Sequence, residues 1–149
     1  MKAHLFKVAL SFDKQRAYRR IACLDTDSLE ELHNEIFRAF DRYDEHMYSF
    51  YFPVKPTKSV STIRHSPEYC HEYALDEDEL PNRNYAFSAS IASLGLTPKQ
   101  KFYYLFDYGD QWWHEITYEG IEECPETEYP VTIARKGESP PQYPDYEEE

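Results

Sequence analysis

The residues best suited to chemistry lie close together in the stretch YLFDYGDQWWHEITYE, residues 104–119. Asp107 and Asp110 flank a Tyr-Gly pair, and His114 follows a few positions later. Two neighbouring carboxylates can share a proton in general acid/base catalysis, and carboxylates with an imidazole suit a divalent metal ion. Asp107, Asp110 and His114 are therefore the candidate catalytic residues.

The pattern of this stretch also predicts the structure that positions these residues. Large apolar side chains alternate with others on both sides of DYGDQ, which is the period of β-strands, and Asp and Gly between two such runs indicate a hairpin turn. Neighbouring strand residues point to opposite faces, so His114 and Glu115 cannot both reach one ion without distortion. The spacing matches no metal-binding motif, so we predict no metal site and expect the two aspartates to bind backbone N–H groups of the turn.

The predicted hairpin carries large rings on both of its faces. Either the two faces are covered, one by a helix and the other by the loop of residues 54–85, or one face is an exposed patch of the kind that marks a binding site. The sequence leaves both alternatives open. The candidate binding residues are Tyr104, Trp112, Trp113, His114 and, from the preceding helix, His33.

The rest of the chain offers no catalytic motif and no cofactor signature. It has no GxSxG elbow or phosphate-binding glycine loop, and its four glycines argue against α/β-hydrolase, P-loop or Rossmann chemistry. Cys70 and His71 are adjacent, so their side chains diverge and a Cys–His dyad is not expected. These observations favour a non-enzymatic protein that uses no cofactor.

The N-terminal third predicts a hairpin, a helix and a returning strand. Apolar residues alternate along residues 6–12, and YRRIACL, residues 18–24, follows as an antiparallel partner. A helix is expected over residues 28–41, because its first residues, SLEE, form a capping box. Residues 47–52 alternate as a strand. The predicted class is α+β: a hairpin-helix-strand (ββαβ, β-grasp-like) opening with the aromatic hairpin in the same mixed or antiparallel sheet.

The remaining segments set the predicted domain boundaries. Residues 54–85 lose periodicity and form an irregular excursion, with a short strand expected at residues 60–64 and an acidic run at 76–79. One domain is expected over residues 1–136. Residues 137–149 are acidic and Pro-rich, and we expect them to form a flexible tail.

The formal net charge is −12, and the acid is concentrated in the C-terminal part. Residues 1–64 hold eleven Lys or Arg and nine Asp or Glu, whereas residues 65–149 hold five and nineteen. Because acidic surfaces repel phosphates, nucleic acid is not an expected partner. The basic run RAYRR, residues 16–20, could meet a phosphate or an acidic peptide, but a solvated strand face is the favoured interpretation.

The cysteines and the hydropathy indicate a cytoplasmic protein. Three cysteines at wide spacing, without a CxxC pair, favour reduced thiols over a disulfide framework. No stretch approaches the roughly twenty apolar residues of a membrane span, and polar residues interrupt the N-terminal apolar stretch that a signal peptide would need. We therefore expect no membrane partner.

Three segments together resemble a known family. RRIACLDTDSLEELHNEIFRAF, FYYLFDYGDQWWHEI and YPVTIARKGESPPQY are similar, in order and spacing, to the plasmid ORF-three-like family of the pRiA type, over about residues 3–143. The resemblance implies an α+β domain without an established activity; the labels resolvase and repressor attached to some members are not backed by catalytic motifs. The pattern maps onto Asp107, Gly109, Asp110, Trp112 and His114 in the hairpin and onto Leu29, Leu32 and His33 in the helix.

The chain departs from that family near its C-terminus. Many relatives carry a Pro-Pro-Glu-Asp motif there, whereas this chain has Pro140-Pro141-Gln142-Tyr143. The departure weakens any hypothesis in which an acidic C-terminal motif completes a site.

Three hypotheses of function follow from the sequence. The preferred one is a protein- or peptide-interaction module that uses the aromatic hairpin and the acidic loop. The alternative is a metal-dependent or acid/base enzyme built on Asp107, Asp110 and His114, and the third is a nucleic-acid-associated protein of mobile elements. The sequence predicts neither the partner nor the oligomeric state.

Overall fold

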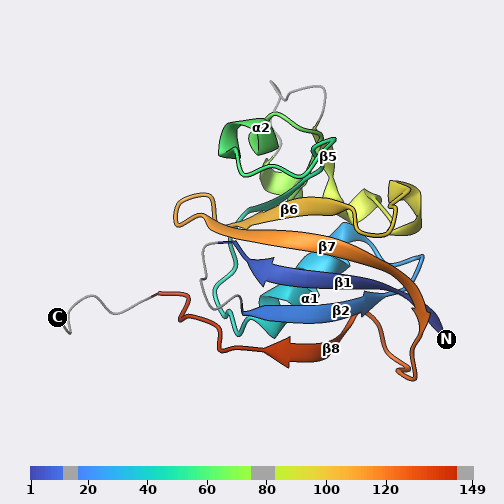
Figure 1. The fold of residues 1–149 in the computed structure, drawn as a ribbon. Coiled ribbons are helices and arrows are strands. Elements are labelled where there is room, and N and C mark those ends of the chain that lie inside the picture. Colours follow the sequence, from blue (N-terminus) through green and yellow to red (C-terminus); the bar gives the residue numbers. More distant parts are fainter. Residues whose placement is uncertain (12–16, 75–82, 144–149) are drawn as a thin grey trace.

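Eight strands pair into one sheet in the computed structural model, which describes residues 1–11, 17–74 and 83–143 (Figure 1). The strands are β1 (Lys2–Leu10), β2 (Tyr18–Cys23), β3 (Tyr48–Tyr51), β4 (Glu68–Cys70), β5 (Arg83–Tyr85), β6 (Lys101–Phe106), β7 (Trp112–Glu123) and β8 (Val131–Lys136). The α-helices in these ranges are α1 (Leu29–Ala39) and the short α2 (Val60–Arg64). The α+β class predicted from the sequence is confirmed. No helix in the described ranges is long and apolar enough to cross a membrane.

The strand order is β5-β4-β3-β6-β7-β1-β2-β8. β1 and β2 pair antiparallel as predicted, with Phe6 opposite Ile21, and β6 and β7 form the predicted second hairpin, with Tyr104 opposite His114. The pairing of β4 with β5 is parallel, which makes the sheet mixed. β3 does not lie beside the opening hairpin, because β6 and β7 stand between them. The long strand β7 therefore joins the two halves of the sheet.

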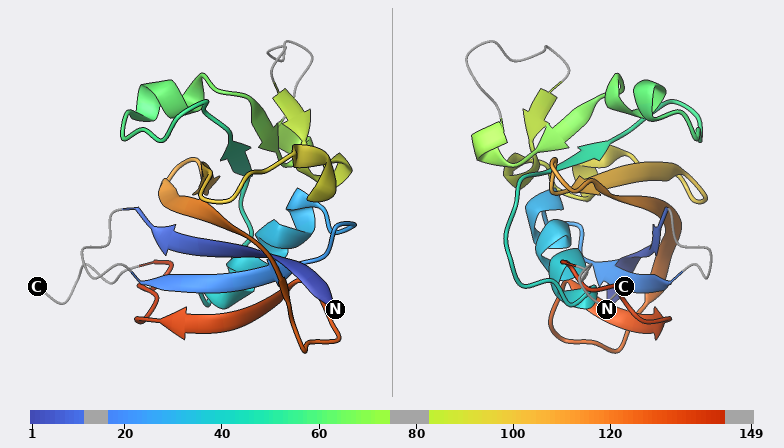
Figure 2. Two further views of the ribbon diagram at one scale, coloured as in Figure 1. Left: turned by 45° about the vertical axis from the view of Figure 1, so that its right-hand side comes forward. Right: turned by 90° about the vertical axis from the view of Figure 1, so that its left-hand side faces the viewer.

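Helix α1 packs against one face of the sheet, and the sheet curves around it (Figure 2). The predicted capping box is present: the Ser28 hydroxyl accepts from the Glu31 N–H at 3.1 Å, and the Glu31 carboxylate accepts from the Ser28 N–H at 3.2 Å. Leu29, Leu32 and Ile36 are fully buried against aromatic side chains of the strands. Because full burial of such a side chain contributes about 1.5–3 kcal/mol, this face holds the main core.

The opposite face of the sheet is covered in part by α2. Residues 60–64 form this helix, and the predicted strand there is wrong. Ser59 caps the helix by accepting from the Thr62 N–H at 3.2 Å, and Ile63 is its only buried residue. Ile63 packs in a second cluster with Tyr51 and Tyr103. A single helical turn is enough to bury one side chain, so the segment needs no strand partner.

Residues 54–85 contain more regular structure than predicted. The segment contains the short helix α2, and after it β4 and β5 extend the sheet beyond β3. The acidic run at residues 76–79, which the preferred hypothesis used as a contact loop, lies outside the described residues.

Residues 137–143, which we expected to belong to a flexible tail, make specific contacts with the domain. Arg19 is buried and donates to the carbonyls of Ala39 and Gly137, and it reaches the Ser139 hydroxyl. The buried Gln142 accepts from two backbone N–H groups and donates to one carbonyl of the segment that follows α1. The rest of the expected tail, residues 144–149, lies outside the described residues.

Gly137 should tolerate alanine less well than Gly95. Both glycines have a positive φ, which costs an alanine roughly 1–2 kcal/mol. A Cβ on Gly137 would also lie 3.0 Å from Ala17 Cβ and 3.1 Å from Ala17 Cα, whereas a Cβ on Gly95 meets nothing within 4 Å. We therefore expect Gly137→Ala to lower the free energy of unfolding by about 1–3 kcal/mol more than Gly95→Ala, as overpacking does. Urea denaturation measures both variants, and equal losses would contradict the close approach of Gly137 to Ala17.

Candidate functional site

His114 is fully buried on the α1 side of β7 and has both ring nitrogens engaged. Its Nε2 lies 2.9 Å from Arg42 Nη2, and its Nδ1 lies 3.2 Å from the Tyr104 carbonyl oxygen. Because a guanidinium can only donate, Nε2 accepts and Nδ1 carries the proton that it donates to the carbonyl. Burial, and then the charge of Arg42, lower the pKa of His114 well below its usual 6.5. Neither nitrogen is available to a metal ion or to a substrate.

Arg42 lies inside a cage of aromatic rings. Its side chain is only 8% exposed, and the centre of its guanidinium lies 5.2, 5.1 and 5.3 Å from the ring centroids of Phe40, Phe106 and Trp112. Cation–π contacts of this kind contribute about 2 kcal/mol or more when the cation is desolvated. Burial lowers the pKa of Arg42 to about 10, so the group remains charged at neutral pH. Its Nη1 has no hydrogen-bond partner in the described chain.

Asp107 of the hairpin behaves as a turn residue. Asp107 adopts a positive φ of 65°, and its Oδ1 accepts from the N–H groups of Gly109 at 3.1 Å and Asp110 at 3.3 Å. Asp110 is exposed at the surface, whereas His114 is fully buried. The three candidate catalytic residues therefore do not form one cluster. Within residues 1–11, 17–74 and 83–143, no three His, Cys, Asp or Glu side chains are placed to hold a metal ion.

Tyr104 and His33 meet inside the α1 face. The fully buried Tyr104 hydroxyl lies 2.5 Å from His33 Nδ1, and His33 Nε2 lies 3.5 Å from a carboxylate oxygen of Glu45. The His33 ring stacks on Tyr48 with a centroid distance of 3.7 Å and an interplanar angle of 8°. Burial lowers the pKa of His33, although Glu45 opposes the shift. Both predicted binding residues are thus held by contacts within the chain.

Trp113 lies on the opposite face and is the least buried of the hairpin's four central rings. Tyr103, Tyr104 and Trp112 are at most 8% exposed, whereas Trp113 is half-buried. Its ring centroid lies 5.8 Å from that of Tyr51, and the Arg64 guanidinium lies 5.8 Å from the Trp113 ring. The alternative of an exposed aromatic patch therefore applies to the surroundings of Trp113 alone.

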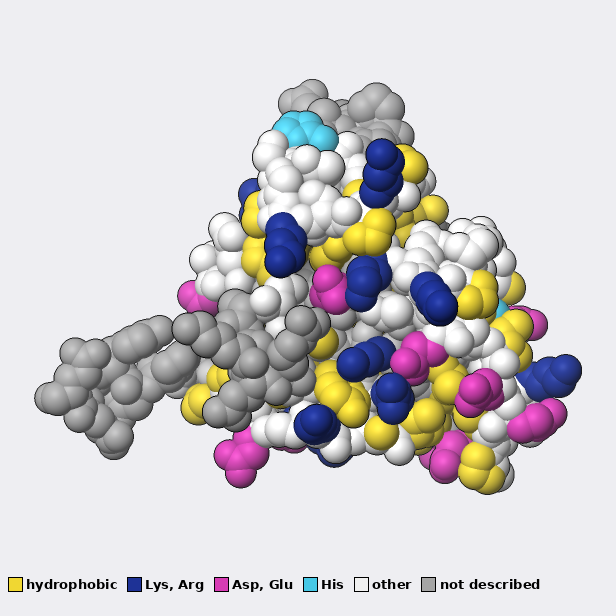
Figure 3. All heavy atoms as spheres, in the orientation of Figure 1, with side chains coloured by type: hydrophobic (Ala, Val, Ile, Leu, Met, Phe, Trp, Pro, Cys, Tyr) yellow, Lys and Arg dark blue, Asp and Glu magenta, His cyan; other side chains and the backbone are white. Residues whose placement is uncertain are grey.

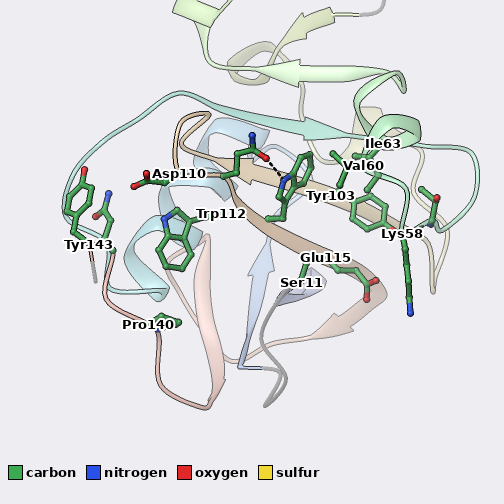
Figure 4. A pocket seen from close by; sticks show the side chains of 14 residues that line it. Ser11, Lys58, Val60, Ile63, Tyr103, Asp110, Trp112, Glu115, Pro140 and Tyr143 are labelled. Atoms are coloured by element: carbon green, nitrogen blue, oxygen red, sulfur yellow. Dashed lines mark hydrogen bonds between the residues drawn. The ribbon is translucent and has the colours of Figure 1, made fainter. Parts of the chain in front are cut away.

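Trp113 is one of the residues that line an open groove of about 1040 Å³. Val60, Ile63 and Tyr103 gather at one end of the groove, and Asp110 and Tyr143 lie at the other, with Trp112 nearby (Figure 4). The groove thus combines the aromatic hairpin with α2 and with the segment of residues 140–143. No local sequence pattern indicates this assembly, because its three parts are far apart along the chain.

The face that carries the groove is rich in cations although the chain is acidic. Lys and Arg side chains are spread over this face from α2 toward β2 and β8 (Figure 3). Lys101 is paired with Glu115 at 2.9 Å. Lys58 and Arg64 are exposed and have no carboxylate within ion-pair distance in the described chain. The α2 end of the groove is therefore positive.

The basic run RAYRR contributes little to this surface. Arg19 is buried, as described above, and Arg20 is paired with Glu119 at 3.1 Å. Arg16 lies outside the described residues. The run therefore does not present the three free cations on which the nucleic-acid hypothesis depends.

Comparison with known proteins shows the family of this chain. The family model described as plasmid pRiA4b ORF-3-like protein matches residues 2–145, so the chain belongs to that family. No curated protein matches the chain. A crystal structure of MM3350 from Methanosarcina mazei Go1, a protein of unknown function, has the same fold: the TM-score is 0.72, the sequence identity is 21%, and the match covers 95% of this chain and 72% of that one.

The depressed pKa of His114 makes stability depend on pH. Above about pH 6.5 the residue is neutral in both the folded and the unfolded state and has no effect on the pH dependence. Below that pH the unfolded chain binds a proton that the folded chain excludes, so the free energy of unfolding should fall by up to roughly 1.4 kcal/mol per pH unit from this residue. The loss continues as pH falls toward the folded-state pKa.

His114→Gln should reduce this acid sensitivity. Glutamine can accept from Arg42 but does not titrate, so the variant should lose stability less steeply than wild type in urea denaturation from pH 7.5 to 5.5, a range set around the usual histidine pKa of about 6.5. Phe40→Leu is the control, because it removes a ring packed on His114 and keeps the imidazole. Parallel pH profiles of His114→Gln and wild type would contradict the assignment.

Proposed function

We propose that this member of the plasmid pRiA4b ORF-3-like family is a protein-interaction module that holds a short peptide segment of a partner protein. The segment would present an aromatic or aliphatic side chain to Trp113 and a carboxylate to the α2 end of the groove. The observation that carries the proposal is the half-buried Trp113 at an open groove of about 1040 Å³, beside two unpaired cations.

The apolar part of the groove supplies the binding energy. Val60, Ile63, Tyr103 and Trp113 contribute its apolar surface, and Ile63 and Tyr103 are buried in one cluster beneath the groove. Tryptophan and tyrosine are enriched among the residues that dominate protein interfaces, because a ring buries a large area at a small cost in conformational entropy. An apolar side chain placed here would cover the exposed part of Trp113.

The charges at the groove select an acidic segment. Lys58 and Arg64 have no carboxylate partner in the described chain, while Glu115 is already paired with Lys101. A carboxylate from the partner would complete the ion pairing at this end. Such rim charges mainly raise the association rate and the specificity, so binding should weaken as salt concentration rises.

The hydrogen bonds of the candidate catalytic residues favour the interaction module over the enzyme hypothesis. His114 has both nitrogens engaged inside the protein, and Asp107 binds the turn backbone. Asp110 is the remaining candidate that faces the groove. A lone exposed carboxylate supplies neither a paired acid and base nor an activated nucleophile.

Selection of peptides from a displayed random library on the immobilised protein tests the proposal. We expect enriched peptides to combine an aromatic or large aliphatic residue with Asp or Glu. Trp113→Ala should weaken the binding of a selected peptide at least about tenfold in fluorescence anisotropy, because the anchor surface is lost. Lys58→Glu should weaken it and reduce its dependence on salt.

Phe87→Ala is the matched control, because Phe87 is an exposed aromatic residue that does not line the groove. It should bind the selected peptide as wild type does. Circular dichroism confirms that each variant is folded. Enrichment of basic peptides, or equal binding by wild type and Trp113→Ala, would overturn the proposal.

A further inference from the structure

A second pocket of about 470 Å³ lies on the α1 side of the sheet. Residues from the first turns of α1, from the segment that leads into β3 and from the end of β4 line it together. They include His33, Glu45, Tyr48 and His71. Neither the family description nor the groove accounts for this grouping of polar side chains.

The Tyr48 hydroxyl is a buried polar group that lacks a partner. Tyr48 is 1% exposed, it lines the pocket, and its hydroxyl makes no hydrogen bond in the described chain. Its ring is held by stacking on His33 and by an edge contact with His71 at 5.7 Å. A buried unpaired hydroxyl costs about 1–3 kcal/mol. A ligand that bonded this group would recover part of that cost.

The charged groups of the pocket are carboxylates. Glu30 and Glu45 line it, and none of its lining residues is Lys or Arg. Burial is the main cause that raises the pKa of the Tyr48 hydroxyl, and the charges of Glu30, Cys70 and Glu45 raise it further. Both carboxylates of the pocket therefore interact electrostatically with this hydroxyl. His33 adds no positive charge near neutral pH, because burial lowers its pKa. The pocket is therefore negative and attracts cations.

The imidazoles fit an organic cation better than a metal ion. His33 Nδ1 is bonded to Tyr104, and His71 Nδ1 accepts from the Tyr73 N–H at 3.0 Å. His46 Nε2 lies 2.7 Å from the Tyr143 hydroxyl. Consistent with these engaged nitrogens, no three ligating side chains in the described chain converge on one point.

We propose that this pocket binds a small organic cation that carries a primary amine. The ammonium group would donate to the carboxylates of Glu30 and Glu45 and to the Tyr48 hydroxyl, which supplies an oxygen acceptor at the buried side. Charge-assisted hydrogen bonds of this kind are about twice as strong as neutral ones. The volume of about 470 Å³ lies in the range of small-molecule sites.

Titration with cadaverine, followed by amide NMR spectra of the full chain, tests this proposal. Cadaverine should cause saturable shifts at residues 30–34, 45–48 and 71. Glutarate, a dianion with a carbon chain of the same length, should cause none. Glu45→Gln should weaken cadaverine binding about tenfold, whereas Glu122→Gln, which removes an equal charge from an exposed site elsewhere, should leave it unchanged.

Tyr48→Phe separates binding from folding. The variant removes the unpaired hydroxyl, so its Tm should rise while its affinity for cadaverine falls severalfold. Trp113→Ala should bind cadaverine as wild type does, because Trp113 lies on the other face of the sheet. Absence of saturable shifts with cadaverine, equal binding of glutarate, or full affinity in Tyr48→Phe would overturn the proposal.

Discussion

The buried guanidinium of Arg42 is the constraint on which the arrangement of the two faces depends. Removing such a cation from water is costly, and here three rings and the acceptor nitrogen of His114 offset the cost. Arg42 lies three residues after the last residue of α1, whereas Phe106, Trp112 and His114 belong to the β6–β7 hairpin. The interaction therefore fixes the end of the helix against the hairpin.

The same interaction sets the roles of the polar groups around it. Because Arg42 donates to His114 Nε2, His114 must donate from Nδ1 to the Tyr104 carbonyl. Tyr104 in turn places its hydroxyl against His33, whose other nitrogen faces Glu45 at the protein surface. A polar chain thus crosses an otherwise aromatic core. Its imidazoles stabilise the structure, so the surfaces available to ligands lie at its margin and on the opposite face.

Strand periodicity made much of this arrangement predictable. It placed Trp112 with His114 and Trp113 with Glu115 on opposite faces, and the capping pattern located α1 to within two residues at each end. The turn role of Asp107 also followed from local chemistry. These features depend on residues that are neighbours in the sequence, where steric and hydrogen-bonding preferences act directly.

The parts that sequence reasoning missed depend on distant contacts. Residues 60–64 alternate weakly, and they form a helical turn because a serine cap and one buried isoleucine are sufficient. Gln142 was assigned to a tail, yet it is buried because it bonds backbone groups about a hundred residues earlier in the chain. No local pattern indicates either contact. The groove and the second pocket are both made from such contacts, so neither could be read from the sequence.

Arg42 Nη1 and the Tyr48 hydroxyl are both buried and have no hydrogen-bond partner in the part of the chain that the structure describes, but they have different meanings for function. Arg42 lines neither the groove nor the second pocket, and its charge is already stabilised by three rings, so the unpaired N–H is a cost of holding the helix to the hairpin. Tyr48 lines a pocket in which the charges of two carboxylates raise the pKa of its hydroxyl. A ligand can relieve only the second cost. On the α1 face, the contacts of Arg42 thus hold the helix to the hairpin, whereas the Tyr48 hydroxyl has no partner in the described chain. The chemistry of this face therefore favours ligand binding at Tyr48.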